Sequence, residues 1–173
     1  MRACREVIVR QAAPGPRLPS LCHARGRENL RWEGAIDGKP GTGLGVRRYE
    51  FLATDRFLVA RHRSVRLPQE KSPAGDEHEE LAVFSIDENR QALVLREFMG
   101  EGIVVRSVCE IDANTVVCTS EAVENGPGIR ALLKLEIVDR FRFTETYAIG
   151  WPGRELEPYF TNQWTRSPGA VPW

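Results

Sequence analysis

The sequence predicts an all-β protein that folds as a single antiparallel up-and-down β-barrel of about ten strands. From Leu30 onward, short runs of alternating apolar and polar residues recur, separated by clusters of Gly, Pro, Asn and Asp. No segment of ten or more residues in this region has the apolar period of a helix. A meander with tight turns favours a barrel over an open sheet, because closure removes both exposed edges.

The first half of this region contains five predicted strands, at 30–36, 43–53, 56–65, 78–86 and 90–99. The stretch GTGLG at 41–45 precedes a strand rather than a helix, so we interpret it as a tight turn and not as a phosphate-binding loop. Thr54-Asp55 and Asp87-Glu88-Asn89 have the residues of hairpin turns. The charged segment PQEKSPAGDE predicts an exposed lip between the third and fourth strands.

The second half contains five more, at 102–111, 115–122, 129–138, 140–149 and 158–166. Short turns are predicted at Gly100-Glu101, Asp112-Ala113-Asn114 and Asp139, and longer breaks at ENGPG and GWPGRELE. Segment 129–138 resembles a helix in its composition, but its length and β-branched ends favour a strand.

Length and charge are those of an ordinary single-domain globular protein. The 173 residues include 24 Lys plus Arg and 24 Asp plus Glu, so we expect no nucleic-acid partner. No apolar run approaches the roughly 20 residues of a membrane span, and charged residues interrupt any secretory signal near the N-terminus. We therefore expect a cytoplasmic protein, and a homodimer remains open.

The composition divides the chain into three regions. Residues 1–28 are an Arg/Pro-rich N-terminal extension that is partly irregular, 29–167 form the barrel, and 168–173 are a C-terminal tail.

The four cysteines are not spaced as CxxC, which excludes a zinc ribbon or a thioredoxin-type motif. If Ala113 and Asn114 are the central residues of a turn, Cys109 and Cys118 face each other across a hairpin. Disulfide geometry is demanding, so we expect two buried thiols rather than a disulfide.

The opening LRWEGAIDG and GLGVRRYEF place a Trp, a Gly and a later aromatic-rich strand in a way that resembles the calycin superfamily. The later SEAVENGPG, DRFRFTETY and NQWTR resemble bacterial lipocalin-like domains of unknown function. The resemblance covers residues 30–166 and implies a small barrel with a central cavity, related to fatty-acid-binding proteins. The nitrobindin-like branch of the superfamily binds haem through a histidine near the C-terminus, but His23, His62 and His78 are the chain's histidines. The matching position is therefore empty, and no cofactor is predicted.

Candidate ligand-binding residues are the side chains that strand alternation can turn toward the barrel interior. They are Trp32, Arg61, His62, Glu97, Glu121, Glu145, Tyr147, Asn162 and Trp164. Arg61 and His62 are alternatives, because adjacent strand residues point to opposite faces. Trp32 and Trp164 lie on the first and last predicted strands, which closure would pair.

Glu145 is the most unusual candidate, because it shares its strand face with Phe141, Phe143, Tyr147 and Ile149. A buried carboxylate requires a cation, a hydrogen-bond network or a proton. Three interpretations stay open: Glu145 or Glu121 anchors a polar ligand group together with an arginine and Tyr147, Glu145 forms an internal bridge such as Arg61–Glu145, or a bulge turns it outward.

These features predict that the protein binds a small hydrophobic or amphipathic molecule in the barrel interior. The alternative is a cavity enzyme, an isomerase or cyclase in which Glu145, Glu121 or His62 is the acid or base. A barrel with a filled interior that acts through its surface is a further alternative. Catalytic residues are not predicted, because no nucleophile motif such as GxSxG is present, and the run DEHEE lacks the fixed geometry of a metal site.

Overall fold

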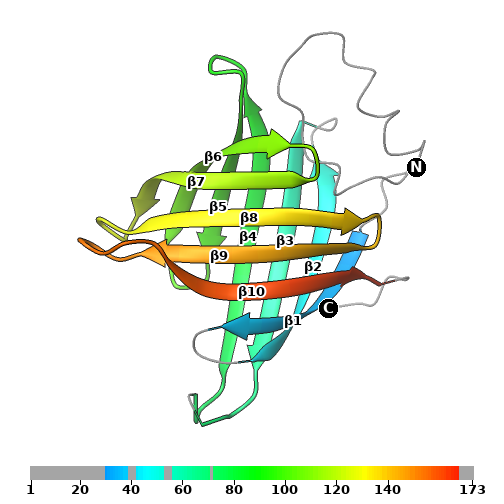
Figure 1. Ribbon diagram of the computed structural model, residues 1–173, viewed down its shortest axis with the longest axis vertical. Helices are drawn as coiled ribbons and strands as arrows, with labels where there is room; N and C mark the ends of the chain where they lie inside the picture. The colour runs from blue at the N-terminus through cyan, green and yellow to red at the C-terminus, as the bar shows by residue number, and fades with distance from the viewer. Residues whose placement is uncertain (1–29, 39–41, 53–55, 71, 168–173) are drawn as a thin grey trace.

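The computed structural model describes residues 30–38, 42–52, 56–70 and 72–167, which form a closed barrel of ten antiparallel strands (Figure 1). The strands are β1 (Leu30–Gly38), β2 (Gly43–Leu52), β3 (Phe57–Arg66), β4 (Asp76–Asp87), β5 (Ala92–Met99), β6 (Val104–Asp112), β7 (Thr115–Glu124), β8 (Arg130–Asp139), β9 (Arg142–Gly150) and β10 (Glu157–Arg166). Each strand pairs with its neighbours in sequence, and β1 pairs with β10. The predicted up-and-down barrel is therefore confirmed.

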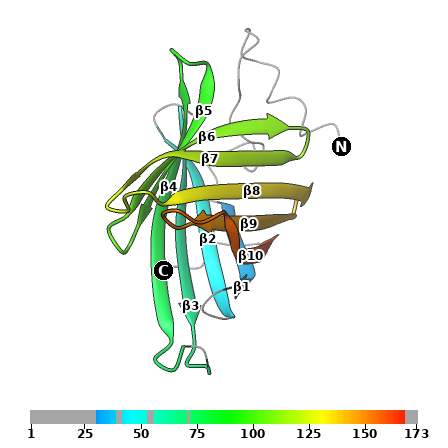
Figure 2. The ribbon, with the colours of Figure 1, turned by 60° about the vertical axis from the view of Figure 1, so that its left-hand side comes forward.

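The barrel has two walls that cross steeply. In Figure 1, β2–β5 run along the long axis at the back, whereas β7–β10 run across them at the front. The view in Figure 2, turned by 60°, shows the same two groups of strands meeting at the barrel's side. Residues on the inner faces of both walls meet between them, so side chains distant in sequence become neighbours.

The core consists of the apolar side chains that alternate toward the interior. Its largest members include Leu58, Phe84, Leu93, Leu95, Leu133, Leu135, Phe143 and Trp164, all at most 4% exposed. Burial of each such side chain stabilises the fold by about 1.5–3 kcal/mol. Phe141 is an exception to the predicted face, because β9 begins only at Arg142 and leaves Phe141 in the preceding turn, where it is exposed.

The β6–β7 hairpin has the predicted register. Cys109 lies opposite Cys118, and Asp112 opposite Thr115, so Ala113 and Asn114 are the central turn residues. Ala113 has a φ of 47°, the positive φ that the first position of a primed hairpin turn requires. The two cysteines are joined by a disulfide, so our expectation of two thiols was wrong.

The predicted extension 1–28 and tail 168–173 lie outside the described residues. Within the described ranges, no helix is long and apolar enough to cross a membrane.

Candidate functional site

A row of four inward side chains crosses the wall formed by β2–β5. Arg47 of β2 lies opposite His62 of β3, His62 opposite Glu80 of β4, and Glu80 opposite Met99 of β5. Directly opposed residues of antiparallel strands project from the same face of a sheet. The register therefore aligns a cation, an imidazole, a carboxyl group and a thioether along one rung of the barrel.

Glu145 of β9 faces this row from the other wall and accepts three hydrogen bonds. Arg47 Nη1 donates to Oε1 at 2.6 Å, while Asn162 Nδ2 and Trp164 Nε1 donate to Oε2 at 3.0 and 2.9 Å. Both carboxylate oxygens thus have strong donors, which offsets the cost of burying the charge. The internal ion pair with Arg47 explains how an acid is accommodated on the apolar face of β9.

Arg47 is held on three sides. Its Nη1 binds Glu145, its Nε donates to His62 Nδ1 at 3.3 Å, and its guanidinium lies 4.7 Å from the centre of the Trp164 ring. Burial alone would lower the pKa of Arg47, but the charge of Glu145, with smaller contributions from Tyr49 and Glu80, raises it well above its ordinary value. The guanidinium is therefore a fixed cation that is already paired.

His62 is neutral at physiological pH. Burial lowers the pKa of His62 well below its ordinary value, and the positive charge of Arg47 lowers it further. Because Arg47 Nε donates to His62 Nδ1, the imidazole proton is assigned to Nε2. The ring also packs edge-on against Trp164, with centroids 5.4 Å apart.

Two further carboxyl groups occupy the same interior. Burial raises the pKa of Glu97 well above its ordinary value, and the neighbouring charges of Glu80 and Glu145 raise it further. Glu80 also has a raised pKa, mainly through burial, although Arg47 opposes the shift. The interior therefore holds three carboxyl groups around one paired arginine.

Among the described residues, four buried side-chain atoms have no hydrogen-bond partner: Arg66 Nε, Glu97 Oε2, Tyr147 Oη and Asn162 Oδ1. The last three belong to residues that are 4%, 4% and 1% exposed, so bulk water does not serve them. Burial raises the pKa of Tyr147, and the charges of Glu97, Glu80 and Glu145 raise it further. Buried polar atoms normally find partners, and unpaired ones call for an explanation.

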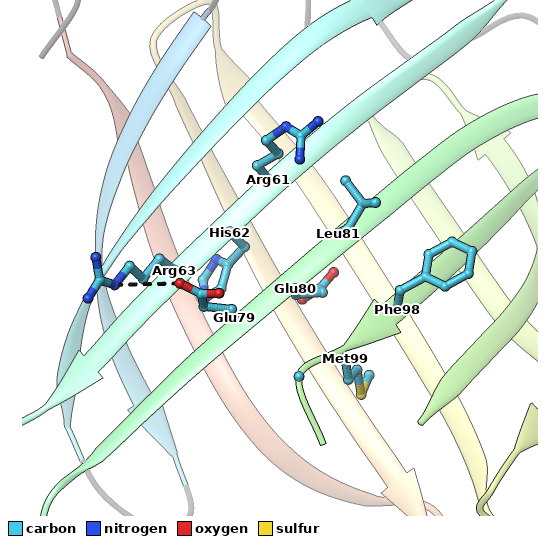
Figure 3. Close-up of a pocket in the computed structure, with 9 residues that line it drawn as sticks. Arg61, His62, Arg63, Glu79, Glu80, Leu81, Phe98 and Met99 are labelled. Atoms are coloured by element: carbon cyan, nitrogen blue, oxygen red, sulfur yellow. Dashed lines mark ion pairs between the residues drawn. The ribbon is translucent and has the colours of Figure 1, made fainter. Parts of the chain in front are cut away.

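A pocket of about 560 Å³ opens beside this group, where β5 ends at Met99 (Figure 3). His62, Glu80 and Met99 line its inner side, Leu81 and Phe98 add apolar surface, and the exposed Arg61, Arg63 and Glu79 add charged groups. His78, on the same face of β4 as Glu80, has its Nδ1 2.8 Å from Glu101 Oε1, in the turn that follows β5. The pocket thus joins a mouth of mixed apolar and charged side chains to the buried polar row.

Six predicted site residues are buried with their side chains in the interior: His62, Glu97, Glu145, Tyr147, Asn162 and Trp164. Trp32 lies on β1, which pairs with β10 as expected, but its side chain is outside the described residues.

Two predicted site residues point outward. Arg61 is exposed and pairs with Glu50 at 3.5 Å, so the suggested Arg61–Glu145 bridge was wrong and Arg47 takes that place. Glu121 is exposed and binds Arg90, because β7 turns Val116 and Cys118 inward and leaves Glu121 on the outer face.

Sequence reasoning missed Arg47 and Glu80. A signal existed for both, since Arg47 shares a face with Tyr49 and Phe51, and Glu80 with Ala82 and Phe84. Each has a like-charged neighbour, Arg48 or Glu79, that made the other face look equally polar.

Among the described residues, no group of three or more His, Cys, Asp or Glu side chains is arranged to hold a metal ion.

No protein-family model and no curated sequence matches the chain. Among solved structures, the barrel is similar to the crystal structure of Rv2717c from M. tuberculosis, with a TM-score of 0.53 and 13% identity, over 79% of this chain and 91% of that one. Similarity at this level of identity shows a shared β-barrel fold. The finer resemblance to bacterial lipocalin-like domains stays a prediction.

Proposed function

We propose that the protein binds a small apolar or amphipathic molecule, which enters the barrel through the pocket at the end of β5. The observation that carries this proposal is the pocket itself, because its volume of about 560 Å³ is lined by His62 and Glu80 of the buried polar row. Small-molecule sites usually have about 300–1,000 Å³ and combine apolar walls with a few convergent polar groups.

The lining suggests how such a molecule lies. Leu81, Phe98 and Met99 offer apolar contact at the mouth, and His62 and Glu80 lead inward to the paired Arg47 and Glu145. An apolar body would rest against the mouth while a polar end reaches the interior. The calycin-like fold shared with Rv2717c is consistent with this use of a barrel interior.

Native mass spectrometry of the purified protein, beside a denaturing mass of the same sample, tests whether a ligand is carried. A mass excess that disappears on denaturation supports the proposal and gives the ligand's mass.

A binding assay with a pocket-blocking variant tests the site itself. Met99→Trp fills the mouth and is expected to weaken binding of the neutral dye Nile red by tenfold or more, about 1.4 kcal/mol. Thr161→Trp, on the exposed outer face of β10, adds the same indole elsewhere and is the matched control. Equal dye binding by both variants and the parent protein would overturn the proposal.

A cavity enzyme is the second candidate, favoured by the raised pKa of Glu97. A buried carboxyl that keeps its proton near neutrality is suited to general-acid work on a hydrophobic substrate, as in an isomerase or cyclase. Glu145 is less suited, since three donors hold its charge. Unchanged turnover of any identified substrate in Glu97→Gln and His62→Ala would exclude this role.

A further inference from the structure

We propose that the ligand's polar end is a protonated amine, which binds between Glu97, Glu80 and Tyr147 rather than at Arg47. This inference rests on the binding role proposed above and specifies the chemistry of the same site. A fatty-acid-like carboxylate is the contrasting ligand, since a barrel arginine would be its natural partner.

Arg47 is already committed to an internal anion. Its Nη1 binds Glu145 at 2.6 Å and its Nε binds His62, and both Arg47 and Glu145 are at most 5% exposed. A ligand carboxylate at Arg47 would have to displace Glu145 or sit beside it in a medium of low dielectric constant. A ligand carboxylate beside Arg47 and the Glu145 carboxylate would repel each other strongly, so the site disfavours an anionic head group.

The buried atoms that lack partners are predominantly acceptors. Glu97 Oε2 and Asn162 Oδ1 present lone pairs, and the Tyr147 hydroxyl can accept as well as donate. An ammonium group carries up to three donors and no acceptor, which matches this set. A ligand carboxylate could accept from Tyr147 Oη and from a protonated Glu97, but it would leave the acceptor Asn162 Oδ1 unpaired.

The surrounding charges favour a cation. The groups whose charges act on Glu97 are Glu80 of β4, Glu145 of β9 and Arg47 of β2, and Glu97 in turn acts on Tyr147 of β9. His62 is neutral, His78 binds Glu101, and Arg66 of β3 binds Asp76 at 2.8 Å. Arg47 thus faces the carboxyl groups of Glu80, Glu97 and Glu145, and an arriving cation would supply the counter-charge that Glu97 lacks.

Three probes that share one tail but differ in the head group test the inference: n-octylamine, 1-octanol and octanoate, each measured at pH 7 by displacement of Nile red. Octylamine is expected to bind tenfold or more tightly than octanol, the discrimination that one hydrogen bond to a charged group gives, about 1.4 kcal/mol. Octanoate is expected to bind more weakly than octanol.

Glu97→Gln keeps the shape of the side chain but removes the charge, so octylamine is expected to lose most of its advantage over octanol. Glu121→Gln, in the exposed pair with Arg90, is the matched control and should keep it. Circular dichroism checks that both variants are folded.

Proton release gives an independent readout. Because burial raises the pKa of Glu97, a bound ammonium group should lower that pKa and release a proton, which calorimetry in phosphate and in Tris detects as a buffer-dependent heat. Glu97→Gln should abolish this buffer dependence.

The outcomes separate the two proposals. If octanol and Nile red bind but octylamine has no advantage, or octanoate binds as tightly, the amine inference is overturned and the binding role stands. If an advantage of octylamine survives Glu97→Gln unchanged, the amine is not held at Glu97 and the inference is likewise overturned. If neither the dye nor any of the three probes binds, both proposals fail.

Discussion

The Arg47–Glu145 pair is a buried ion pair in which each partner depends on the other. Their side chains are 6% and 3% exposed, and Asn162 and Trp164 complete the hydrogen bonds of the carboxylate. The net contribution of a buried ion pair to stability is small, but removing one partner leaves the other charge buried and unpaired. Single substitutions at this pair are therefore informative about its role.

Glu145→Gln is expected to destabilise the protein by about 3–5 kcal/mol, because it leaves the Arg47 guanidinium buried without an anion. The free energy of urea unfolding measures the change. Glu50→Gln, which breaks the exposed pair with Arg61, should cost no more than about 1 kcal/mol. Similar losses of unfolding free energy in the two variants would show that the buried pair contributes no more to stability than the exposed pair.

Glu97 gives the protein a pH dependence whose sign follows from its raised pKa. A carboxyl group whose pKa is higher in the folded than in the unfolded protein contributes stability below its unfolded pKa, which is near 4.3. This contribution is lost as the pH rises through the folded pKa. Glu97→Gln is therefore expected to be more stable than the parent protein at pH 8, with an advantage that shrinks toward pH 4. Urea unfolding across this range measures it.

His62 contributes in the opposite direction, since its lowered pKa removes stability as the pH falls through the folded value. It is present in both proteins, so their difference isolates Glu97. An advantage for Glu97→Gln that does not change with pH would contradict the raised pKa.

The residue level also shows where sequence patterns are decisive and where they are not. Strand alternation placed Glu97, Glu145 and Asn162 in the interior, because each has apolar neighbours two positions away. It could not choose between Arg61 and His62, whose strand is polar on both faces at that point. His62 becomes buried and Arg61 stays exposed only when the neighbouring strands pack against β3.

At the level of elements, the β6–β7 hairpin shows how local geometry sets register. The turn at Ala113 and Asn114 brings Cys109 and Cys118 directly opposite each other. Further along the same pair of strands, a bulge at Glu121 changes the register by one residue. Glu121 was misplaced because it shares its face with Val117 and Thr119, whereas Val116 and Cys118 are the residues that point into the core.

The disulfide in this hairpin is expected to stabilise the fold by roughly 2–3 kcal/mol, because it closes a short loop in the unfolded chain. The double variant Cys109→Ala/Cys118→Ala should therefore have a lower midpoint of thermal unfolding than the oxidised parent protein. Dithiothreitol should lower the midpoint of the parent and leave the double variant unchanged. A parent protein that is insensitive to complete reduction would contradict this expectation.

For the whole molecule, the order of strands and their boundaries followed from the sequence. The largest difference is two residues, as at the start of β9, predicted at 140 and observed at 142. Turn residues and apolar alternation are local signals, so both can be recognised in a single sequence. The site is different, because Arg47 and Glu145 are 98 residues apart and meet only after the walls close. Which inner faces oppose each other depends on how the two walls cross, and that is a property of the closed barrel.

Closure itself depends on a small residue at the seam between β1 and β10. Gly34 lies opposite Trp164, and a Cβ at position 34 would stand 2.6 Å from the Gln163 carbonyl oxygen and 2.9 Å from Trp164 Cε3. Neither contact can be relieved without moving the strand or the indole that binds Glu145. A shift at the seam between β1 and β10 would therefore also move Trp164 and its hydrogen bond to Glu145.

Gly34→Ala is therefore expected to destabilise the protein by about 1–3 kcal/mol and to weaken Nile red binding as well, since Trp164 is displaced from Glu145. Urea unfolding and dye titration measure the two effects. Thr165→Ala, an exposed position of β10 paired with Glu33 across the same seam, should change neither by more than about 0.5 kcal/mol. If Gly34→Ala matches Thr165→Ala in both measurements, the seam tolerates a larger residue and closure does not control the site.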